Sequence, residues 1–138
     1  MPAYLLAGLI VIGLASAAGT AAAHHPFAAE FDQNKRVTLT GIVTKVEWTN
    51  PHVWFYINVQ DETGTVTNWA AEMGPPHGLQ RSGWRRETLK IGEVVTVDGS
   101  LAKDGSTRLN ASRVTMKRTG LRPGETPLLI AEGRHFRE

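Results

Sequence analysis

Apolar and polar residues alternate most regularly in HVWFYINVQ, residues 52–60. The odd positions are apolar, and the even positions carry His52, Trp54, Tyr56 and Asn58. A period of two is typical of a strand with one buried face. The turn DETG (61–64) and the stretch TVTNWAAEM (65–73) follow, so we predict a β-hairpin here.

A longer strand is predicted at RVTLTGIVTKVEW, residues 36–48. Its apolar residues change phase at a glycine, because Val37 and Leu39 precede Gly41 on one phase and Ile42 follows on the other. One extra residue in a strand moves all later side chains to the opposite face, and a glycine often marks such a bulge. We therefore expect the change of face at Gly41.

The region 74–93 contains prolines and glycines and has no period of two, so we predict a connection with one or two short helical turns. Its candidate core residues are Leu79, Trp84 and Leu89. Strand patterns resume at VVTVDGSLA (94–102) and at TRLNASRVTM (107–116), with the turn KDG between them.

Three strands, a short helical connection and two more strands are the order of an OB-fold, a five-stranded, partly open Greek-key barrel. An immunoglobulin-like sandwich would need about seven strands. We therefore expect an all-β fold with a small helical connection, built as a five-stranded OB-fold-like Greek-key barrel. Gly41 and Gly99 are the expected kinks that let the short sheet close.

An N-terminal hydrophobic signal or anchor helix is expected before the barrel, because residues 1–23 carry no charge. Tyr4 to Leu14 is an apolar core, and Ala21 with Ala23 forms an A-x-A cleavage site that would leave His24 first. Cleavage after Ala22 is also compatible with the small residues. No Lys or Arg precedes the core, and a retained anchor is the alternative because a spanning helix needs about 20 apolar residues.

These boundaries predict four segments: the signal peptide or anchor (1–23), a His-containing leader (24–35), the OB-like domain (36–118) and an irregular C-terminal tail (119–138). Cleavage would place the protein in the periplasm or outside the cell, and a retained helix would anchor it in the inner membrane facing the periplasm. The chain has no cysteine, which excludes disulfides, thiolate metal sites and cysteine nucleophiles.

Charge is distributed unevenly along the chain. Residues 24–80 carry three Lys/Arg against six Asp/Glu, whereas residues 81–138 carry twelve against seven. The cations Arg81, Arg85, Arg86 and Lys90 gather on the predicted connection; we expect a solvated face there, with acidic partners or lipid headgroups as the alternative. Nucleic acid is not an expected partner, because the strand carrying Trp54 and Tyr56 lies in the acidic half.

A copper ion is the ligand that the histidines favour. A mature chain starting at His24 offers an α-amine and an imidazole on one residue, and His25 or His52 would complete a nitrogen-rich set suited to Cu(II). If cleavage follows Ala22, His25 becomes the third residue, and the amine, two backbone nitrogens and the imidazole form a square-planar site. The alternative is that the His pair is only a polar leader. Otherwise we expect no cofactor.

A different class of function is an interaction module without metal. In an OB-fold the face of the second and third strands binds ligands. The candidate ligand-binding residues, for a periplasmic protein partner or a small ligand, are Trp54, Tyr56, Trp69 and Met73. Ordinary core packing is the alternative for these side chains. The chain lacks a Gly-rich phosphate loop and a Gly-x-Ser-x-Gly elbow, so we expect no enzyme.

Four stretches, HHPFAAEFD, VTLTGIVTKVEWTNPH, NWAAEMG and GWRRETLKIGEVVTVDGSLAKDGS, resemble the DUF6152 family of small exported bacterial proteins. The resemblance covers roughly residues 24–116 and implies a periplasmic or secreted β-barrel protein without an established reaction. The long C-terminal tail and His77 depart from the family pattern, so His77 and His135 are poor candidates for a shared site. Periplasmic copper chaperones of OB architecture are similar more loosely, since the chain has His52, Trp54, Trp69 and Met73 but not that family's motif. Trp54, Trp69 and Met73 are candidate neighbours of the ion only if it is Cu(I).

Overall fold

The computed structural model describes residues 27–116 and the backbone of residues 129–132. The predicted signal segment, His24 and His25 lie outside the described residues. The elements are α1 (Phe27–Glu30), β1 (Phe31–Glu47), β2 (Trp54–Gln60), β3 (Val66–Glu72), α2 (Pro76–Arg81), β4 (Val94–Ala102), β5 (Arg108–Met116) and β6 (Leu129–Glu132). Within these ranges, none of the helices has the length and apolar character needed to span a membrane.

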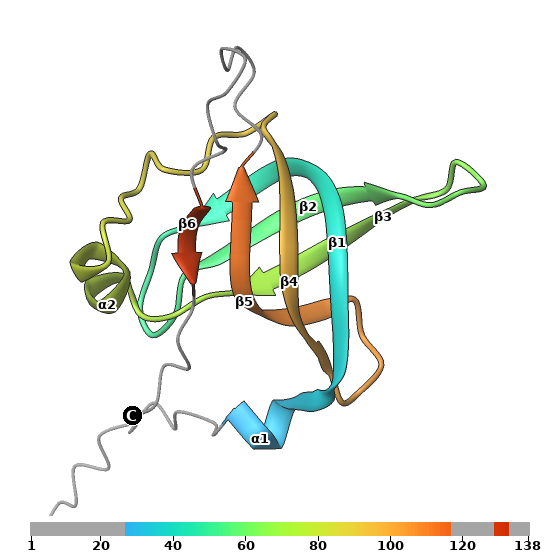
Figure 1. Ribbon diagram of the computed structural model, residues 1–138, viewed down its shortest axis with the longest axis horizontal. Helices are drawn as coiled ribbons and strands as arrows, with labels where there is room; N and C mark the ends of the chain where they lie inside the picture. Colours follow the sequence, from blue (N-terminus) through green and yellow to red (C-terminus); the bar gives the residue numbers. More distant parts are fainter. Residues whose placement is uncertain (1–26, 117–128, 133–138) are drawn as a thin grey trace, which may run out of the picture.

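The strands pair in the order β3-β2-β1-β4-β5-β6, and an additional parallel pairing joins β3 to β5 (Figure 1). β1 is long enough to pair with β4 over Phe31–Ile42 and with β2 over Ile42–Glu47. The predicted mostly β fold, with five main strands and a short helical connection after the third, is therefore confirmed. The pairings of β1 to β5 close on themselves, because β3 meets β5 as well as β2.

Two boundaries differ from the predicted ones. β1 begins at Phe31, inside the segment predicted as a leader, and its first residue pairs with Ala102 of β4. β6 lies inside the segment predicted as an irregular tail, and it pairs with β5 from Arg113 to Thr115. Backbone hydrogen bonding thus extends the sheet beyond the stretches that alternate clearly in the sequence.

The predicted change of face at Gly41 is wrong. Pairing with β4 runs without a shift from Arg36 to Ile42, and the shift lies between Val43 and Lys45 in the pairing with β2. Ile42, the residue that suggested the earlier change, faces outward and is 49% exposed. The bulge is therefore at Thr44, where the pairing partner of β1 has already changed from β4 to β2.

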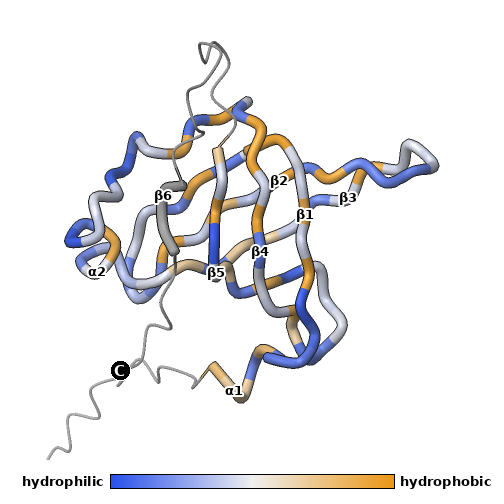
Figure 2. Tube along the Cα trace, viewed as in Figure 1, coloured by the Kyte–Doolittle hydropathy of each residue, from blue (hydrophilic) through white to orange (hydrophobic). Residues whose placement is uncertain are grey.

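Alternation in β2 is confirmed, because Phe55 and Ile57 are buried and Val59 packs partly buried against the core, whereas the even positions are partly or fully exposed. The core also takes in the three apolar residues predicted for the connection, Leu79, Trp84 and Leu89. Figure 2 shows the result along the chain, with hydrophobic positions recurring on the strands and hydrophilic ones on the hairpin tip and near α2. The strands and the connection therefore contribute to one core.

Gly41 and Gly99 do have geometric roles, which differ from a change of face. A Cβ at Gly41 would lie 2.5 Å from the carbonyl oxygen of Asn58, and a Cβ at Gly99 would lie 2.4 Å from that of Asn110. Neither contact can be relieved by a side-chain rotation, because both partners are backbone atoms of the neighbouring strand. The two glycines therefore allow strands to approach closely.

Gly99→Ala should lower the free energy of unfolding by about 1–3 kcal/mol, because the added methyl group overpacks a backbone contact between β4 and β5. Chemical denaturation followed by tryptophan fluorescence measures the change. The control is Lys35→Ala, an exposed position on β1, for which the expected change is within about 0.5 kcal/mol. Equal stabilities of the Gly99 variant and wild type would contradict the close approach.

Candidate functional site

A direct contact between His52 and Glu72 is the centre of the candidate site. Nδ1 of His52 lies against Oε1 of Glu72, as a hydrogen bond or an ion pair. The His52 side chain is 30% exposed, whereas the Glu72 side chain is only 9% exposed. A partly accessible imidazole is therefore held from behind by a buried carboxylate.

Strand pairing explains why Glu72 is buried. Glu72 is the last residue of β3, and its pairing partners are Trp54 on β2 and Asn110 on β5. Its backbone thus has a paired strand on each side, at the point where β3 meets both β2 and β5. The side-chain amide of Asn110 donates a hydrogen bond to the carboxylate, which satisfies part of its hydrogen-bonding capacity.

Burial raises the pKa of the Glu72 carboxyl above its ordinary value of 4.5, and the negative charge of Glu30 raises it further. His52 and the hydrogen bond from Asn110 act in the opposite direction and are outweighed. Loss of hydration disfavours the charged form of an acid, so the ionised Glu72 carboxylate costs folding stability. The fold thus places a carboxyl group at a position where its ionisation lowers the stability of the protein.

α1 lies close to this pair. The backbone N–H of Lys103 donates to the Glu30 carbonyl at 2.8 Å, and the Lys103 ammonium donates to the carbonyl of Ala28. The rings of Phe27 and Phe31 stack with their centroids 5.7 Å apart. These contacts tie α1 to the end of β4 (Figure 1). Glu30 is thereby kept within electrostatic reach of Glu72.

A row of register partners crosses all five main strands at this end of the sheet. Arg36 on β1 pairs with Ser100 on β4, and Ser100 pairs with Asn110 on β5. Asn110 pairs with Glu72 on β3, and Glu72 pairs with Trp54 on β2. The Arg36 guanidinium donates to Ser100 Oγ at 3.1 Å, and it donates to Ser112 Oγ at 2.7 Å. Polar groups thus continue along the outer side of the sheet up to the His52 and Glu72 pair.

The predicted outer face of β2 is present. Trp54 and Tyr56 are both partly exposed on it, beside the more exposed Asn58. The Tyr56 hydroxyl donates to Glu47 at 2.9 Å, and the Lys45 ammonium pairs with Glu47 and lies 5.2 Å from the centre of the Tyr56 ring. Tyr56 is therefore fixed by polar contacts, while its ring remains partly accessible.

Trp69 and Met73 do not join Trp54 and Tyr56. Trp69 pairs with Ile57, so it lies on the inward side of the sheet and packs against the core. Met73 is 6% exposed and belongs to the core itself. Because successive side chains of a strand point to opposite faces, the four residues predicted as one ligand-binding set are divided between two faces.

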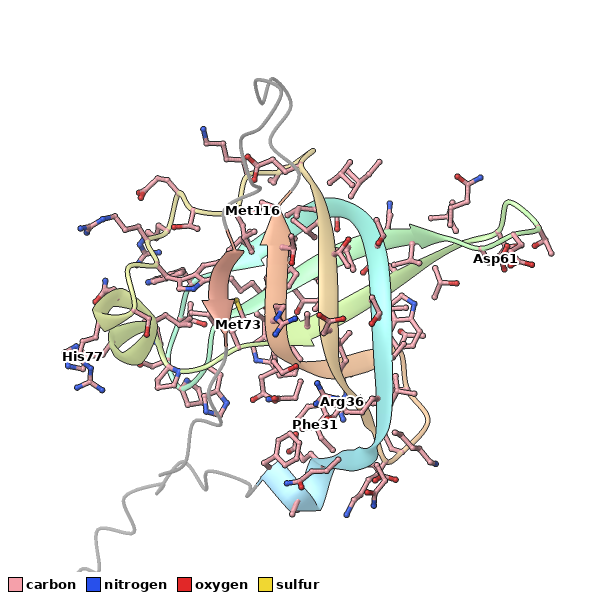
Figure 3. All side chains as sticks on the ribbon, viewed as in Figure 1. Phe31, Arg36, Asp61, Met73, His77 and Met116 are labelled. Carbon is pink, nitrogen blue, oxygen red and sulfur yellow. The ribbon has the colours of Figure 1, made fainter. Side chains whose placement is uncertain are left out.

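Of the three predicted metal ligands, the structure describes only His52. Within residues 27–116 and 129–132, no group of three or more His, Cys, Asp or Glu side chains is arranged to hold a metal ion. His77 is exposed on the outer side of α2, away from Phe31 and α1 (Figure 3). A complete metal site therefore requires donors from outside the described residues.

The sequence profile of a family of unknown function, DUF6152, matches residues 11–112, which is most of the chain. The chain belongs to the DUF6152 family. The resemblance seen in the sequence is thereby confirmed, and comparison of this DUF6152 protein with curated proteins gives no significant match.

Solved structures of other proteins are similar to this DUF6152 protein at low identity. A mitochondrial single-stranded DNA-binding protein of S. cerevisiae, Rim1, is 13% identical with a TM-score of 0.48, covering 65% of this chain and 98% of its own. The N-terminal domain of PriB from Thermoanaerobacter tencongensis is 17% identical with a TM-score of 0.46, covering 63% of this chain and 100% of its own. At such identities the similarity extends to the mostly β fold alone.

Glu72→Gln in the metal-free protein should gain stability relative to wild type as the pH rises. At a pH well below 4.5, Glu72 is protonated in both the folded and the unfolded chain, so its charge contributes nothing to the free energy of unfolding. From 4.5 up to the raised pKa of the folded protein, the unfolded chain releases the proton first, so the wild type loses stability through this window. Glutamine has no such proton and shows no such loss.

The measurement is the free energy of unfolding of both proteins by denaturant titration, from about pH 4 to about pH 8. The expected difference is smallest in acid and grows in favour of the glutamine variant. A difference that shrinks or reverses with rising pH would show that partners of the carboxylate outweigh its burial.

Proposed function

We propose that this protein is an exported, non-enzymatic binding protein that holds a copper ion with His24, His25 and His52. The proposal includes an OB-fold-like Greek-key barrel for the body and removal of residues 1–23 on export to the periplasm or beyond. A retained N-terminal helix, anchoring the same site to the inner membrane, is the alternative for localisation. The observation that carries the proposal is the position of α1 beside the His52 and Glu72 pair.

The chain connectivity supports this donor set. His25 precedes Glu30 by five residues, and an extended chain covers at most about 3.5 Å per residue, so His25 lies within about 18 Å of Glu30. Because Glu30 is within electrostatic reach of Glu72, and Glu72 contacts His52, a mature chain starting at His24 would begin within reach of the His52 imidazole. A chelating terminus and a fixed imidazole are thus available at one end of the sheet.

Glu72 would act as a positioning residue for His52. A carboxylate on one ring nitrogen of a metal-binding histidine fixes the ring orientation and raises the basicity of the other nitrogen. The contact of Glu72 with Nδ1 assigns Nε2 of His52 to the metal in this proposal. In this proposal, the buried carboxylate lowers the stability of the fold but increases the metal affinity of His52.

The donor set favours Cu(II) over Cu(I). An α-amine and imidazoles suit Cu(II), whereas thioethers and thiolates select Cu(I). The chain has no cysteine, and Met73 is buried on the inward side with Trp69. Within the described residues, soft donors are therefore not presented beside His52, although Trp54 lies on the same face as that histidine.

The second candidate function is an interaction module without metal, and the partly exposed Trp54 and Tyr56 favour it. Both rings lie on the outer face of β2, and Tyr56 is held rigid by its hydrogen bond to Glu47. Rigid aromatic side chains provide a large contact area at a low entropic cost, and they are common in the centres of protein interfaces. The partner would be a periplasmic protein or a small organic ligand.

His52→Ala removes one of the proposed copper donors, so it should weaken Cu(II) binding at least as much as the loss of a positioning residue does, which is roughly 10–100-fold. Glu72→Gln should weaken binding by about 10–100-fold through loss of ring positioning. Isothermal calorimetry of the chain recovered from the exported fraction measures both effects. The matched control is His77→Ala, an exposed histidine on α2, which should bind copper as wild type does.

One additional alanine placed before His24 tests the role of the chain terminus. The insertion moves the α-amine away from the His24 imidazole, so the visible absorption spectrum of the Cu(II) complex should change. An unchanged spectrum, or equal affinities of the His52 and His77 variants, would refute the proposed donor set. Absence of copper binding combined with loss of a protein complex in Trp54→Ala would establish the interaction module instead.

A further inference from the structure

The connection between α2 and β4 presents four cations on a short stretch of chain. Arg81 ends α2, and Arg85, Arg86 and Lys90 follow, all exposed. Figure 3 shows nitrogen-bearing side chains pointing outward along this border of the molecule. Residues 81–91 form this cationic connection.

The backbone of the cationic connection is held in place. Trp84 and Leu89 are buried in the core, so the chain is fixed on the inward side at both of these points. The N–H of Arg85 donates to the Thr88 hydroxyl at 2.8 Å, and the N–H of Gly92 donates to the Val43 carbonyl at 2.8 Å. The cations therefore extend from a defined platform.

The charges of the cationic connection are not neutralised locally. Within residues 27–116, its four cations make no ion pair, and the one carboxylate on the connection is that of Glu87. Glu93, just beyond it, accepts a hydrogen bond from the backbone of Lys90. A net positive surface of this kind attracts an anionic partner, and the attraction weakens as salt increases.

An exposed apolar side chain lies at the end of the same surface. Ile91 is 73% exposed, the highest fraction among the exposed large hydrophobic residues of the described chain. It occupies a turn that Gly92 completes with φ +91°. Cations next to a protruding apolar side chain match a lipid surface, where headgroups meet the former and the acyl boundary accepts the latter.

An unsatisfied donor lies under the connection. Nε1 of Trp84 is buried and has no hydrogen-bond partner in the described part of the chain. Trp84 lines a narrow cleft together with Arg85 and Arg86, with Trp48 and Met73 on the apolar side. The cleft has no room for a water molecule, so the unpaired donor is a feature of core packing beneath the cationic connection.

We propose that the cationic connection, with Ile91 at its end, docks the protein on an anionic phospholipid surface. Ile91 favours this partner over a soluble polyanion, because a polyanion offers no apolar region that could bury the aliphatic side chain. The proposal goes beyond copper binding and does not depend on it, since none of the proposed copper ligands belongs to the connection.

Vesicle co-sedimentation of the chain as exported tests the proposal, in the presence of a chelator so that copper plays no part. The vesicles are phosphatidylcholine alone or phosphatidylcholine with phosphatidylglycerol at low salt. Wild type should bind the anionic vesicles and not the neutral ones. Arg85→Gln with Arg86→Gln should lower the partition coefficient roughly 25-fold, about fivefold for each cation. Ile91→Ser should lower it roughly tenfold by removing the buried aliphatic group.

Two control variants match these changes. Lys35→Gln removes a cation beside Arg36, which Figure 3 places near α1 and away from His77 on α2, and it should change binding by less than about twofold. Val66→Ser removes an apolar side chain that is 56% exposed on β3, and it should leave binding unchanged. Every variant carries the same N-terminus, so that segment contributes equally to each measurement.

Three outcomes would overturn the proposal. The first is equal binding to neutral and anionic vesicles. The second is equal losses in the connection variants and their controls. The third is binding to heparin or polyglutamate that matches the vesicle affinity and is insensitive to Ile91→Ser, which would assign the surface to a soluble polyanion. None of these outcomes bears on the copper site, which the calorimetry and the absorption spectrum of the Cu(II) complex test separately.

Discussion

The parallel pairing of β3 with β5 is short, and the architecture of this end of the molecule depends on it. Ala70, Ala71 and Glu72 pair with Arg108, Leu109 and Asn110, and the N–H of Ala70 donates to the carbonyl of Thr107 at 3.0 Å. Without this contact the strands would form an open sheet with β3 at its edge. With it, Glu72 has a strand on each side and loses most of its access to water.

The burial of Glu72 links the closing of the sheet to the chemistry of the site. A carboxylate with its pKa raised by burial reduces stability at neutral pH, so a glutamine or an apolar residue would serve the fold better. The contact with His52 gives the carboxylate a role that a neutral residue could not fill. Polar groups that cost stability are common where a protein positions a functional side chain.

The succession of strands along the chain and the burial pattern of β2 could be predicted from the sequence because both depend on local alternation. The bulge in β1 could not, since Thr44 carries no signal and the shift arises where the pairing partner changes. Trp69 and Met73 share the phase of Ala71, but the face they occupy is set by the pairing of Trp69 with Ile57. Which residues of two neighbouring strands share a face depends on the pairing register, and the alternation within each strand does not determine that register.

Glu72 was missed as a site residue for a related reason. In the sequence it is one acidic residue at the end of a predicted strand, and its burial results from Asn110, 38 positions later in the chain. The contact with His52 joins residues 20 positions apart through a hairpin. His52 itself was found because it follows a turn at the start of a clearly alternating strand, which placed it on the outer face with Trp54.

The most direct test of the account is paramagnetic broadening of backbone amide signals by Cu(II) at less than one equivalent. An unpaired electron broadens the signals of nearby nuclei, and this effect falls steeply with distance, so the affected residues locate the ion. Broadening should be centred on His52, Glu72 and α1, and the signals of the β2–β3 hairpin tip should be unaffected. Broadening centred on His77, or spread over the surface carboxylates without a centre, would contradict the proposed site.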